Sequence, residues 1–425
     1  MCRRRASRRS DEIVLPSASD HTTHLPEGEI TVAGDPAAVE QPQPRSTEGF
    51  QASRVLTLSL AHAVHDTYGS FLAPLLPSLI AKLSLSMTQA GLLDFLRAAP
   101  SLLQPVIGHV ADRVSLRYFV ILAPALTATM MSLLGVAPRY TVLVLLVLVA
   151  GLGSAALHAV APAMAGRLSG RSLGRGMGVW MVGGSIGFAL GPILVVSAVN
   201  FFTLEGTPWL MIGGWIASAI LYVRLRDLPQ LSPPARQAGS WRDALQALRP
   251  LLAPLVGIVM VRALMVSAQI TFLPTFLIQE GSTLWFAGFS LTVLTGAGWL
   301  GALLGGSMSD RVGRRVVLFI SMLSASVLML LFLAVSGWSR LPILLVMGIM
   351  GPSVRTVLMA MVQENCPDNR ALATGLYLAL TFTSESGAAV VMGALGDLFG
   401  LRVAFTISAI ILLLGSPLAR LLPER

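Results

Sequence analysis

The sequence predicts an all-α integral membrane protein with twelve transmembrane helices, arranged as two six-helix halves related by a pseudo-two-fold axis. Three observations support this prediction. Hydrophobic residues make up 54% of the 425 residues and charged residues only 12%, whereas a soluble domain carries about 25% charged residues. Apolar segments long enough to span a bilayer recur along the chain. One loop pattern, Gly-x-x-x-Asp-Arg-Val-x-x-Arg, begins at Gly108 and again at Gly306.

The repeated loop is the most informative feature of the chain. Each copy lies between two long apolar runs, after the second predicted span of its half. In a hydrophobic chain, a repeat of this size is typical of a secondary transporter whose binding site lies between the two halves.

Each half accommodates six spans of membrane-crossing length. Those of the first half, residues 54–225, are 54–80, 87–111, 117–136, 140–166, 175–201 and 207–225. Those of the second half, residues 250–425, are 250–279, 285–309, 315–335, 340–364, 369–397 and 400–421.

Two polar segments complete the domain organisation. Residues 1–53 are rich in Pro, Ser and Thr and are predicted to be a disordered cytoplasmic tail. Residues 226–249 contain three prolines and are predicted to be a cytoplasmic linker between the halves. Within this linker, one helix face has the composition of a short interfacial helix. It comprises Trp241, Ala244, Leu245 and Leu248.

Arginine residues mark one side of the membrane. The loops on that side contain the repeated pattern, residues 167–175, the linker and the C-terminus, whereas the opposite loops carry few basic residues. Those few are Lys82, Arg139, Arg340 and Arg402. By the positive-inside rule, both termini are predicted to be cytoplasmic, in a multi-pass protein of the bacterial inner (plasma) membrane. The formal net charge of +9 therefore follows from topology and does not indicate nucleic acid binding.

Ionisable residues inside predicted spans cost about 2.5–3.5 kcal/mol each on insertion scales and are candidates for function. In the first span, His62, His65 and Asp66 share one helix face, and Asp66 lies near mid-depth. A carboxylate beside imidazoles can bind and release protons, as can His158 in the fourth span. In the alternative interpretation, Asp66 only orients a structural histidine, and His158 donates to a backbone carbonyl. Asp94 and Arg97 are predicted to form a neutralised structural pair.

The second half carries permanent positive charge at depth. Arg262 and Arg355 lie in apolar sequence, and arginine cannot neutralise itself by losing a proton. Each needs a carboxylate, a group of carbonyls or an anionic substrate. Glu385 is the obvious protein partner and, alternatively, a second proton site. Gln269, seven residues after Arg262, can add a hydrogen bond to a substrate.

Several motifs resemble one family. The loop pattern after spans 2 and 8 resembles the signature loop of the major facilitator superfamily. Gly183, Gly184, Ser185, Gly187, Gly191 and Pro192 in span 5 resemble the glycine-proline motif of its drug-proton antiporters. Segments His62–Asp66, Gln104-Pro105-x-x-Gly108 and Gly151-x-Gly153-Ser154-x-x-x-His158 resemble the fosmidomycin-resistance branch. That branch tends to have proline after the span-4 histidine, where this chain has Ala159 and a later Pro162.

The resemblance implies that spans 1, 4, 7 and 10 line a central cavity. The loop residues are predicted to form a conformational latch, because the aspartate can pair with arginines of neighbouring helices in one state only. The latch residues are Gly108, Asp112, Arg113, Arg117, Gly306, Asp310, Arg311 and Arg315. Alternatively, the arginines only anchor the topology. The span-5 glycines either form a packing groove or take part in coupling.

These observations favour proton-coupled efflux of a drug or organic anion by antiport, with a role in antibiotic resistance. The alternative is a proton-coupled symporter that imports an organic anion or metabolite. A membrane enzyme built on Ser154 and His158 lacks an oxyanion loop, and a haem or metal protein would not explain the repeat. We therefore expect a monomer in the lipid bilayer that binds protons and an anionic or amphipathic small molecule. No cofactor, metal ion or nucleic acid is expected.

We predict that Asp112→Asn and Asp310→Asn each slow turnover more than they weaken substrate binding. Both positions are predicted to lie at the cytoplasmic face, so losing the carboxylate should shift the inward–outward population and not remove a substrate contact. Transport rates, substrate binding and cysteine labelling from the cytoplasmic side measure this. Equal losses of binding and turnover with unchanged labelling would contradict the latch.

Overall fold

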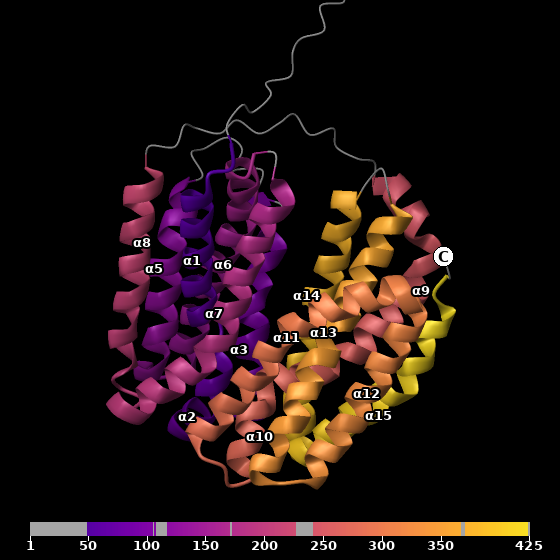
Figure 1. Ribbon diagram of the computed structural model, residues 1–425. Coiled ribbons are helices and arrows are strands. Elements are labelled where there is room, and N and C mark those ends of the chain that lie inside the picture. The colour runs from indigo at the N-terminus through magenta and orange to yellow at the C-terminus, as the bar shows by residue number, and fades with distance from the viewer. Residues whose placement is uncertain are drawn as a thin grey trace, which may run out of the picture. The chain divides into compact units, whose positions relative to one another are not determined.

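A computed structural model describes residues 49–104, 106–107, 117–170, 172–226, 241–366 and 370–423. All regular secondary structure in these residues is helical (Figure 1). Most of the predicted tail and linker lies outside the described residues, as do Gly108, Asp112 and Arg113 of the first loop copy.

The six crossings of the first half alternate between single long helices and pairs of shorter ones. In chain order they are α1 (Ala52–Gly69) with α2 (Leu72–Leu83); α3 (Met87–Ala98) with η1 (Ala99–Leu103); α5 (Arg117–Ser132) with η2 (Leu133–Val136); α6 (Tyr140–Leu168); α7 (Leu173–Phe202); and η3 (Thr207–Leu210) with α8 (Met211–Leu225).

The six crossings of the second half follow the same order. They are α9 (Trp241–Ser267) continued by a π-helical turn η4 (Ala268–Phe272) and α10 (Leu273–Gln279); α11 (Leu284–Val312); α12 (Arg314–Ala334); η5 (Gly337–Ser339) with α13 (Arg340–Asn365); α14 (Arg370–Phe399); and α15 (Leu401–Gly415) with η6 (Ser416–Leu421).

Ten helices in the described residues are long and apolar enough to cross a membrane, and they correspond to predicted spans 3 to 12. The first predicted span is divided between α1 and α2. The break follows from Pro74, which lacks an N–H and whose ring crowds the carbonyl of Ser70, one turn earlier. The second predicted span is formed by α3 and η1 and runs on toward residues that are not described.

Two predicted boundaries need correction. Helix α1 begins at Ala52, inside the segment predicted as tail. Residues 241–249, predicted as linker with a separate interfacial helix, are instead the first part of α9. The reason is that their helical spacing continues without interruption into span 7, and Leu248 is already buried there. The two prolines that follow bend or weaken a helix but do not end this one.

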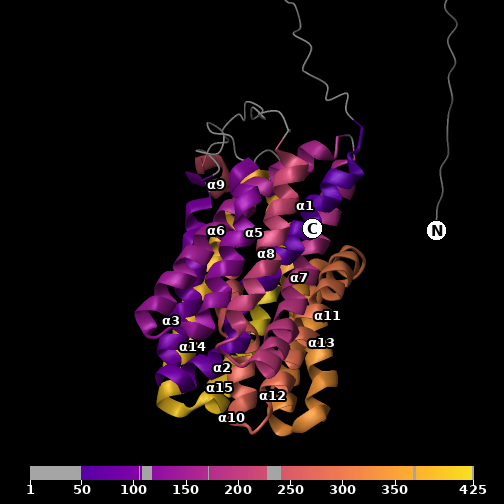
Figure 2. The same ribbon diagram turned by 90° about the vertical axis from the view of Figure 1, so that its left-hand side faces the viewer.

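The two halves form separate groups of helices, α1–α8 and α9–α15, which stand side by side in Figure 1 and overlap in Figure 2. We call the side carrying residues 227–240 the linker side, which is at the top of both figures. The opposite side, which carries the short loops at residues 84–86, 203–206 and 280–283, is the far side.

The halves contact each other closely on the far side. A Cβ atom at Gly91 of α3 would lie 2.1 Å from the carbonyl oxygen of Ala389 in α14. One at Gly393 would lie 2.2 Å from the carbonyl oxygen of Met87. Only glycine permits this backbone approach. Asp397 of α14 then accepts hydrogen bonds from the Met87 and Thr88 N–H groups at 2.7 and 2.9 Å and from Thr88 Oγ1 at 2.6 Å.

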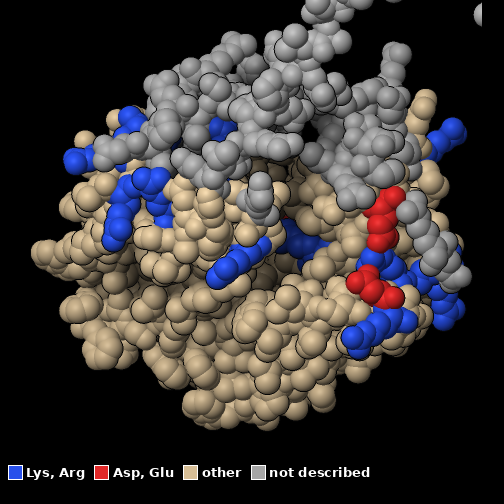
Figure 3. All heavy atoms as spheres, turned by 45° about the horizontal axis from the view of Figure 1, so that its top comes forward, with Lys and Arg blue, Asp and Glu red and all other residues tan. Residues whose placement is uncertain are grey.

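The linker side is open by comparison. Within the described residues, no hydrogen bond joins the halves there. The first half has its own buried core at this level, formed by residues such as Leu58, Leu157 and Trp180, without any residue of the second half. The surface is hollowed between the two groups of helices, and basic side chains are visible in the hollow (Figure 3). The described arrangement is therefore closed on the far side and open toward the linker side.

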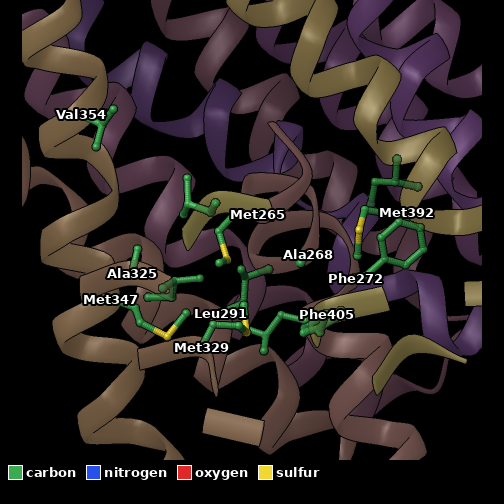
Figure 4. Close-up of a cluster of buried hydrophobic side chains, with 14 of the residues drawn as sticks. Met265, Ala268, Phe272, Leu291, Ala325, Met329, Met347, Val354, Met392 and Phe405 are labelled. Atoms are coloured by element: carbon green, nitrogen blue, oxygen red, sulfur yellow. The ribbon is translucent and has the colours of Figure 1, made fainter. Parts of the chain in front are cut away.

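A methionine-rich core supports the second half. Met265, Met329, Met347 and Met392 pack with Phe272, Leu291 and Phe405 (Figure 4). Unbranched thioether side chains fill irregular gaps. Here they surround the π-helical turn η4, and π-helical turns are frequent at functional sites.

We predict that Asp397→Ala opens the far side. The change removes three hydrogen bonds to a charged acceptor, each worth about 1.5–3 kcal/mol, so the closed population should fall at least tenfold. A cysteine at Gly69, where a side chain meets no neighbour within 4 Å, should then react faster with an impermeant thiol reagent supplied from the far side. Asp397→Asn should give a smaller effect, and Glu205→Gln, an exposed change on the same side, none. Unchanged labelling in Asp397→Ala would rule out this lock.

Candidate functional site

The first half contains a cluster of ionisable side chains contributed by α1 and α6. His62 and Asp66 lie one turn apart on α1, and their Nε2 and Oδ2 atoms are 3.1 Å apart. His158 of α6 brings its Nε2 to 3.3 Å from His62 Nε2 and 3.7 Å from Asp66 Oδ1. We call His62, Asp66 and His158 the acceptor cluster. His62 is buried, whereas the side chain of His158 is 34% exposed and that of Asp66 19% exposed.

The hydrogen-bond partners of the two histidines determine their tautomers. His62 Nδ1 lies 3.0 Å from the Trp180 carbonyl oxygen, and His158 Nδ1 lies 2.9 Å from the Ser154 carbonyl oxygen. A carbonyl can only accept, so each neutral ring carries its hydrogen on Nδ1 and presents a lone pair at Nε2. Two such nitrogens and a carboxylate therefore converge without a donor among them. This arrangement needs a cation, because three adjacent acceptors repel one another.

The cluster combines the interpretations considered for its members. His158 does donate to a backbone carbonyl, and its other nitrogen also faces Asp66. His65, predicted on the same face, is fully enclosed, and neither ring nitrogen makes a well-formed hydrogen bond. Its ring centroid lies 5.8 Å from that of His158. His65 therefore borders the acceptor cluster without belonging to it.

Helix α7 forms one wall of the cluster. The Trp180 indole stacks on the His62 ring with centroids 3.8 Å apart and an interplanar angle of 12°. The same residue supplies the carbonyl that fixes the His62 tautomer. The acceptor cluster is also a group in the described residues that could hold a metal ion, since its ligand atoms all lie within 4.8 Å of one another. Its three acceptors are thus the atoms that any bound cation would contact.

The second half contains two arginines that share one carboxylate. Arg262 Nη1 donates to Glu385 Oε1 at 2.7 Å, and Arg355 Nη2 lies 3.6 Å from Glu385 Oε2. Both oxygens of Glu385 are thus engaged by guanidinium groups. This geometry supports a counter-ion role for Glu385 over the predicted role as a second proton site. With two guanidinium groups and one carboxylate, the group carries a net positive charge.

Several donors of this basic group are buried without a hydrogen-bond partner. They are Arg262 Nε, Arg355 Nε and Nη2, and Gln269 Nε2. A buried donor left unpaired costs about 1–3 kcal/mol, and more when it is charged. The unpaired donors come from α9, its continuation η4 and α13. They are the features expected of a site that awaits an anionic ligand.

A third charged pair bridges the halves. Asp94 Oδ1 accepts from Arg97 Nε and Nη2 at 3.1 and 2.8 Å, as the spacing predicts. Its other oxygen accepts from Thr271 Oγ1 of η4 at 2.8 Å, across the interface between the halves. Asp94, Arg97 and Thr271 line a small pocket there together with Gly69 and Pro192. Nothing in the spacing of Thr271 indicated this contact.

The second copy of the loop pattern forms ion pairs, but with an arginine outside the predicted latch. Asp310 lies 2.9 Å from Arg314 Nη2, and Arg314 Nε donates to Glu364 of α13 at 3.1 Å. Arg315 Nε donates to the Leu422 carbonyl, and Arg311 is exposed. In the first copy the position of Arg314 is occupied by Leu116. Arg117 there donates to the Arg226 carbonyl.

Two groups of six membrane crossings, joined by close contacts on one side, define the fold of a secondary transporter. The chain belongs to the major facilitator superfamily, which its sequence matches over residues 58–303 and 255–425. This assignment confirms the predicted family and twelve-helix, two-half fold, and places the chain among transporters and not enzymes. It is a multi-pass membrane protein.

Relatives extend along nearly the whole chain. The fosmidomycin resistance protein of Escherichia coli (strain K12) is 24% identical over 393 residues, which cover 89% of this chain and 97% of that protein. The uncharacterized MFS-type transporter YfnC of Bacillus subtilis (strain 168) is 26% identical over 387 residues, 87% of this chain and 92% of that protein.

Solved structures show the same fold. A bacterial homolog of the human lysosomal transporter Spinster, inward-facing and occupied, aligns with a TM-score of 0.74 at 16% identity and covers 88% of this chain and 97% of that one. The nucleoside transporter NupG aligns with a TM-score of 0.67 at 16% identity, over 85% of this chain and 97% of that one.

Proposed function

We propose that this protein is a proton-coupled antiporter that exports an organic anion or an acidic drug by alternating access. The acceptor cluster is the observation that carries the proposal. A proton added to His62 Nε2 or to Asp66 turns the 3.1 Å contact between two acceptors into a charge-assisted hydrogen bond. Histidine and carboxylate side chains near one another exchange protons in the physiological pH range. The cluster is thus suited to bind protons reversibly inside the membrane.

The substrate end of the proposal rests on the basic group of the second half. Its two guanidinium groups share a single carboxylate, and four donor atoms have no hydrogen-bond partner. A carboxylate, phosphonate or phosphate matches the planar fork of arginine. The E. coli relative carries the name of a fosmidomycin resistance protein, which favours export of an acidic drug. Proton-coupled uptake uses the same parts and is the alternative.

Alternating access follows from the contacts between the halves. The far-side contacts at Gly91, Gly393 and Asp397 must open when the linker side closes. The arginine-rich loops make the linker side the cytoplasmic side by the positive-inside rule. In this state the transporter would accept its substrate from the cytoplasm. Counterflow in vesicles with an imposed pH gradient, inside acidic or inside alkaline, separates export by antiport from uptake by symport.

We predict that Asp66→Asn abolishes proton-driven exchange and preserves membrane insertion. The amide is neutral and easier to bury than a carboxylate, but it no longer attracts a proton to the two imidazoles. Substrate flux driven by a pH gradient should fall at least tenfold, whereas the yield of monodisperse protein should not. Asp94→Asn serves as a matched control, because this carboxylate is already paired with Arg97.

Two results would contradict the proton site. One is wild-type proton-driven flux in Asp66→Asn vesicles. The other is loss of wild-type exchange on adding a metal chelator, which would mean that the acceptor cluster works with a bound metal ion.

We predict that Arg355→Gln raises the concentration of anionic substrate needed for half-maximal transport by roughly 10–100-fold, the equivalent of one charged hydrogen-bonded contact. Arg262→Gln should act similarly but should also lower thermal stability, because Arg262 holds Glu385 at 2.7 Å. Lysine at position 355 should rescue only in part, since it lacks the fork. Normal transport of a neutral or cationic best substrate by both Gln variants would make the arginines structural.

A further inference from the structure

The glycines of α7 divide into two sets according to what they face on α1. Gly183, Gly187 and Gly191 face its backbone. Cβ atoms at these positions would lie 2.2, 2.0 and 2.3 Å from the carbonyl oxygens of Ser59, Ala63 and Thr67. This four-residue spacing lets two helix backbones pack directly against each other. These three glycines therefore account for the close packing of α7 on α1.

Gly184 faces side chains. A Cβ atom there would lie 2.3 Å from His62 Cε1, 2.6 Å from His62 Nε2 and 2.8 Å from Asp66 Oδ2. All three atoms belong to the acceptor cluster. Trp180, one turn earlier on the same face of α7, stacks on His62 and accepts its Nδ1 hydrogen. One face of α7 therefore touches the acceptor cluster at both the stacked surface and the reactive edge of the His62 ring.

We propose that Gly184, with Trp180, is a positioning residue for the proton site, and that the missing side chain at 184 allows His62 Nε2 and Asp66 Oδ2 to meet. The proposal rests on the proposed function of the acceptor cluster. The His62 ring cannot retreat freely, because its face is stacked on the Trp180 indole and its Nδ1 is bound to the Trp180 carbonyl. A methyl group at 184 must therefore separate the ring from the carboxylate.

The separation has a defined consequence. A proton held between His62 and Asp66 is stabilised by both groups, so moving them apart weakens proton binding. The ionisable groups acting on Asp66 are His62 and His65 of α1 and His158 of α6, and the face of α7 adds only Trp180 and glycine. Half-maximal exchange should then require a more acidic pH. Coupling would depend on α7, which also contacts α11 of the other half, where the Ile193 N–H donates to Thr292 Oγ1 at 3.2 Å.

The test compares glycine substitutions along one helix in the full-length protein reconstituted in vesicles. Gly184→Ala should move the pH of half-maximal exchange by about one unit toward acid. Gly178→Ala is the matched control, because a side chain there meets nothing within 4 Å, and it should retain the wild-type midpoint. Gly187→Ala should lower thermal stability through its clash with Ala63, and any protein recovered should keep the wild-type midpoint.

A second measurement does not require transport. Protonation of His62 should quench the stacked Trp180, so the fluorescence difference between wild type and Trp180→Phe should titrate with pH in detergent. Trp180→Phe also keeps the proposal testable if Gly184→Ala fails to insert, because its exchange midpoint should shift in the same direction by a smaller amount. Identical midpoints in Gly184→Ala and Gly178→Ala, or an unshifted midpoint in Trp180→Phe, would overturn the inference.

The outcome is distinguishable from failure of the proposed function. Proton-driven exchange at the wild-type rate in Asp66→Asn would overturn the proton site itself. Loss of exchange in Asp66→Asn, together with an unshifted Gly184→Ala midpoint, would leave the proton site in place and remove only the role of Gly184.

Discussion

The energetic cost of placing ionisable groups in an apolar medium constrains this structure more than any other single factor. The two halves meet it differently. In the first half, Asp66 is bordered by imidazoles, which can gain or lose a proton, so the charge of the acceptor cluster is adjustable. In the second half, Arg262 and Arg355 cannot lose theirs, and a single carboxylate leaves their charge only partly compensated. An adjustable acceptor and a fixed donor are the two elements that exchange of protons for an anion requires.

Close backbone packing makes this arrangement movable. Glycines bring α1 against α7 within one half and α3 against α14 across the halves. On the far side the contact between halves is completed by Asp397, whose acceptor oxygens receive the first N–H groups of α3. On the linker side, Arg314 joins Asp310 to Glu364 within the second half. A few polar contacts at opposite ends, over apolar helices that slide easily, suit a molecule with two stable orientations.

Much of the candidate site could be predicted from single-helix spacing. The i, i+4 relation places His62 and Asp66 on one face, and the i, i+3 relation pairs Asp94 with Arg97. Spacing could not show that His65 turns away from the cluster, because a helix face is wide and the neighbouring helices decide which part is enclosed. It also could not identify Arg314, since the repeat directed attention to positions shared by both copies, and Leu116 occupies that position in the first.

The sequence by itself determined the twelve spans, the two halves and the ionisable residues that must lie within the membrane, because bilayer thickness and charge cost act on each segment separately. Only the tertiary structure decided which of these residues meet. The contacts of His62 with His158, of Glu385 with both arginines, of Asp397 with α3 and of Gly184 with the acceptor cluster all join different helices. Their existence depends on the rotation and height of one helix against another, which packing sets and the periodicity within a helix does not record.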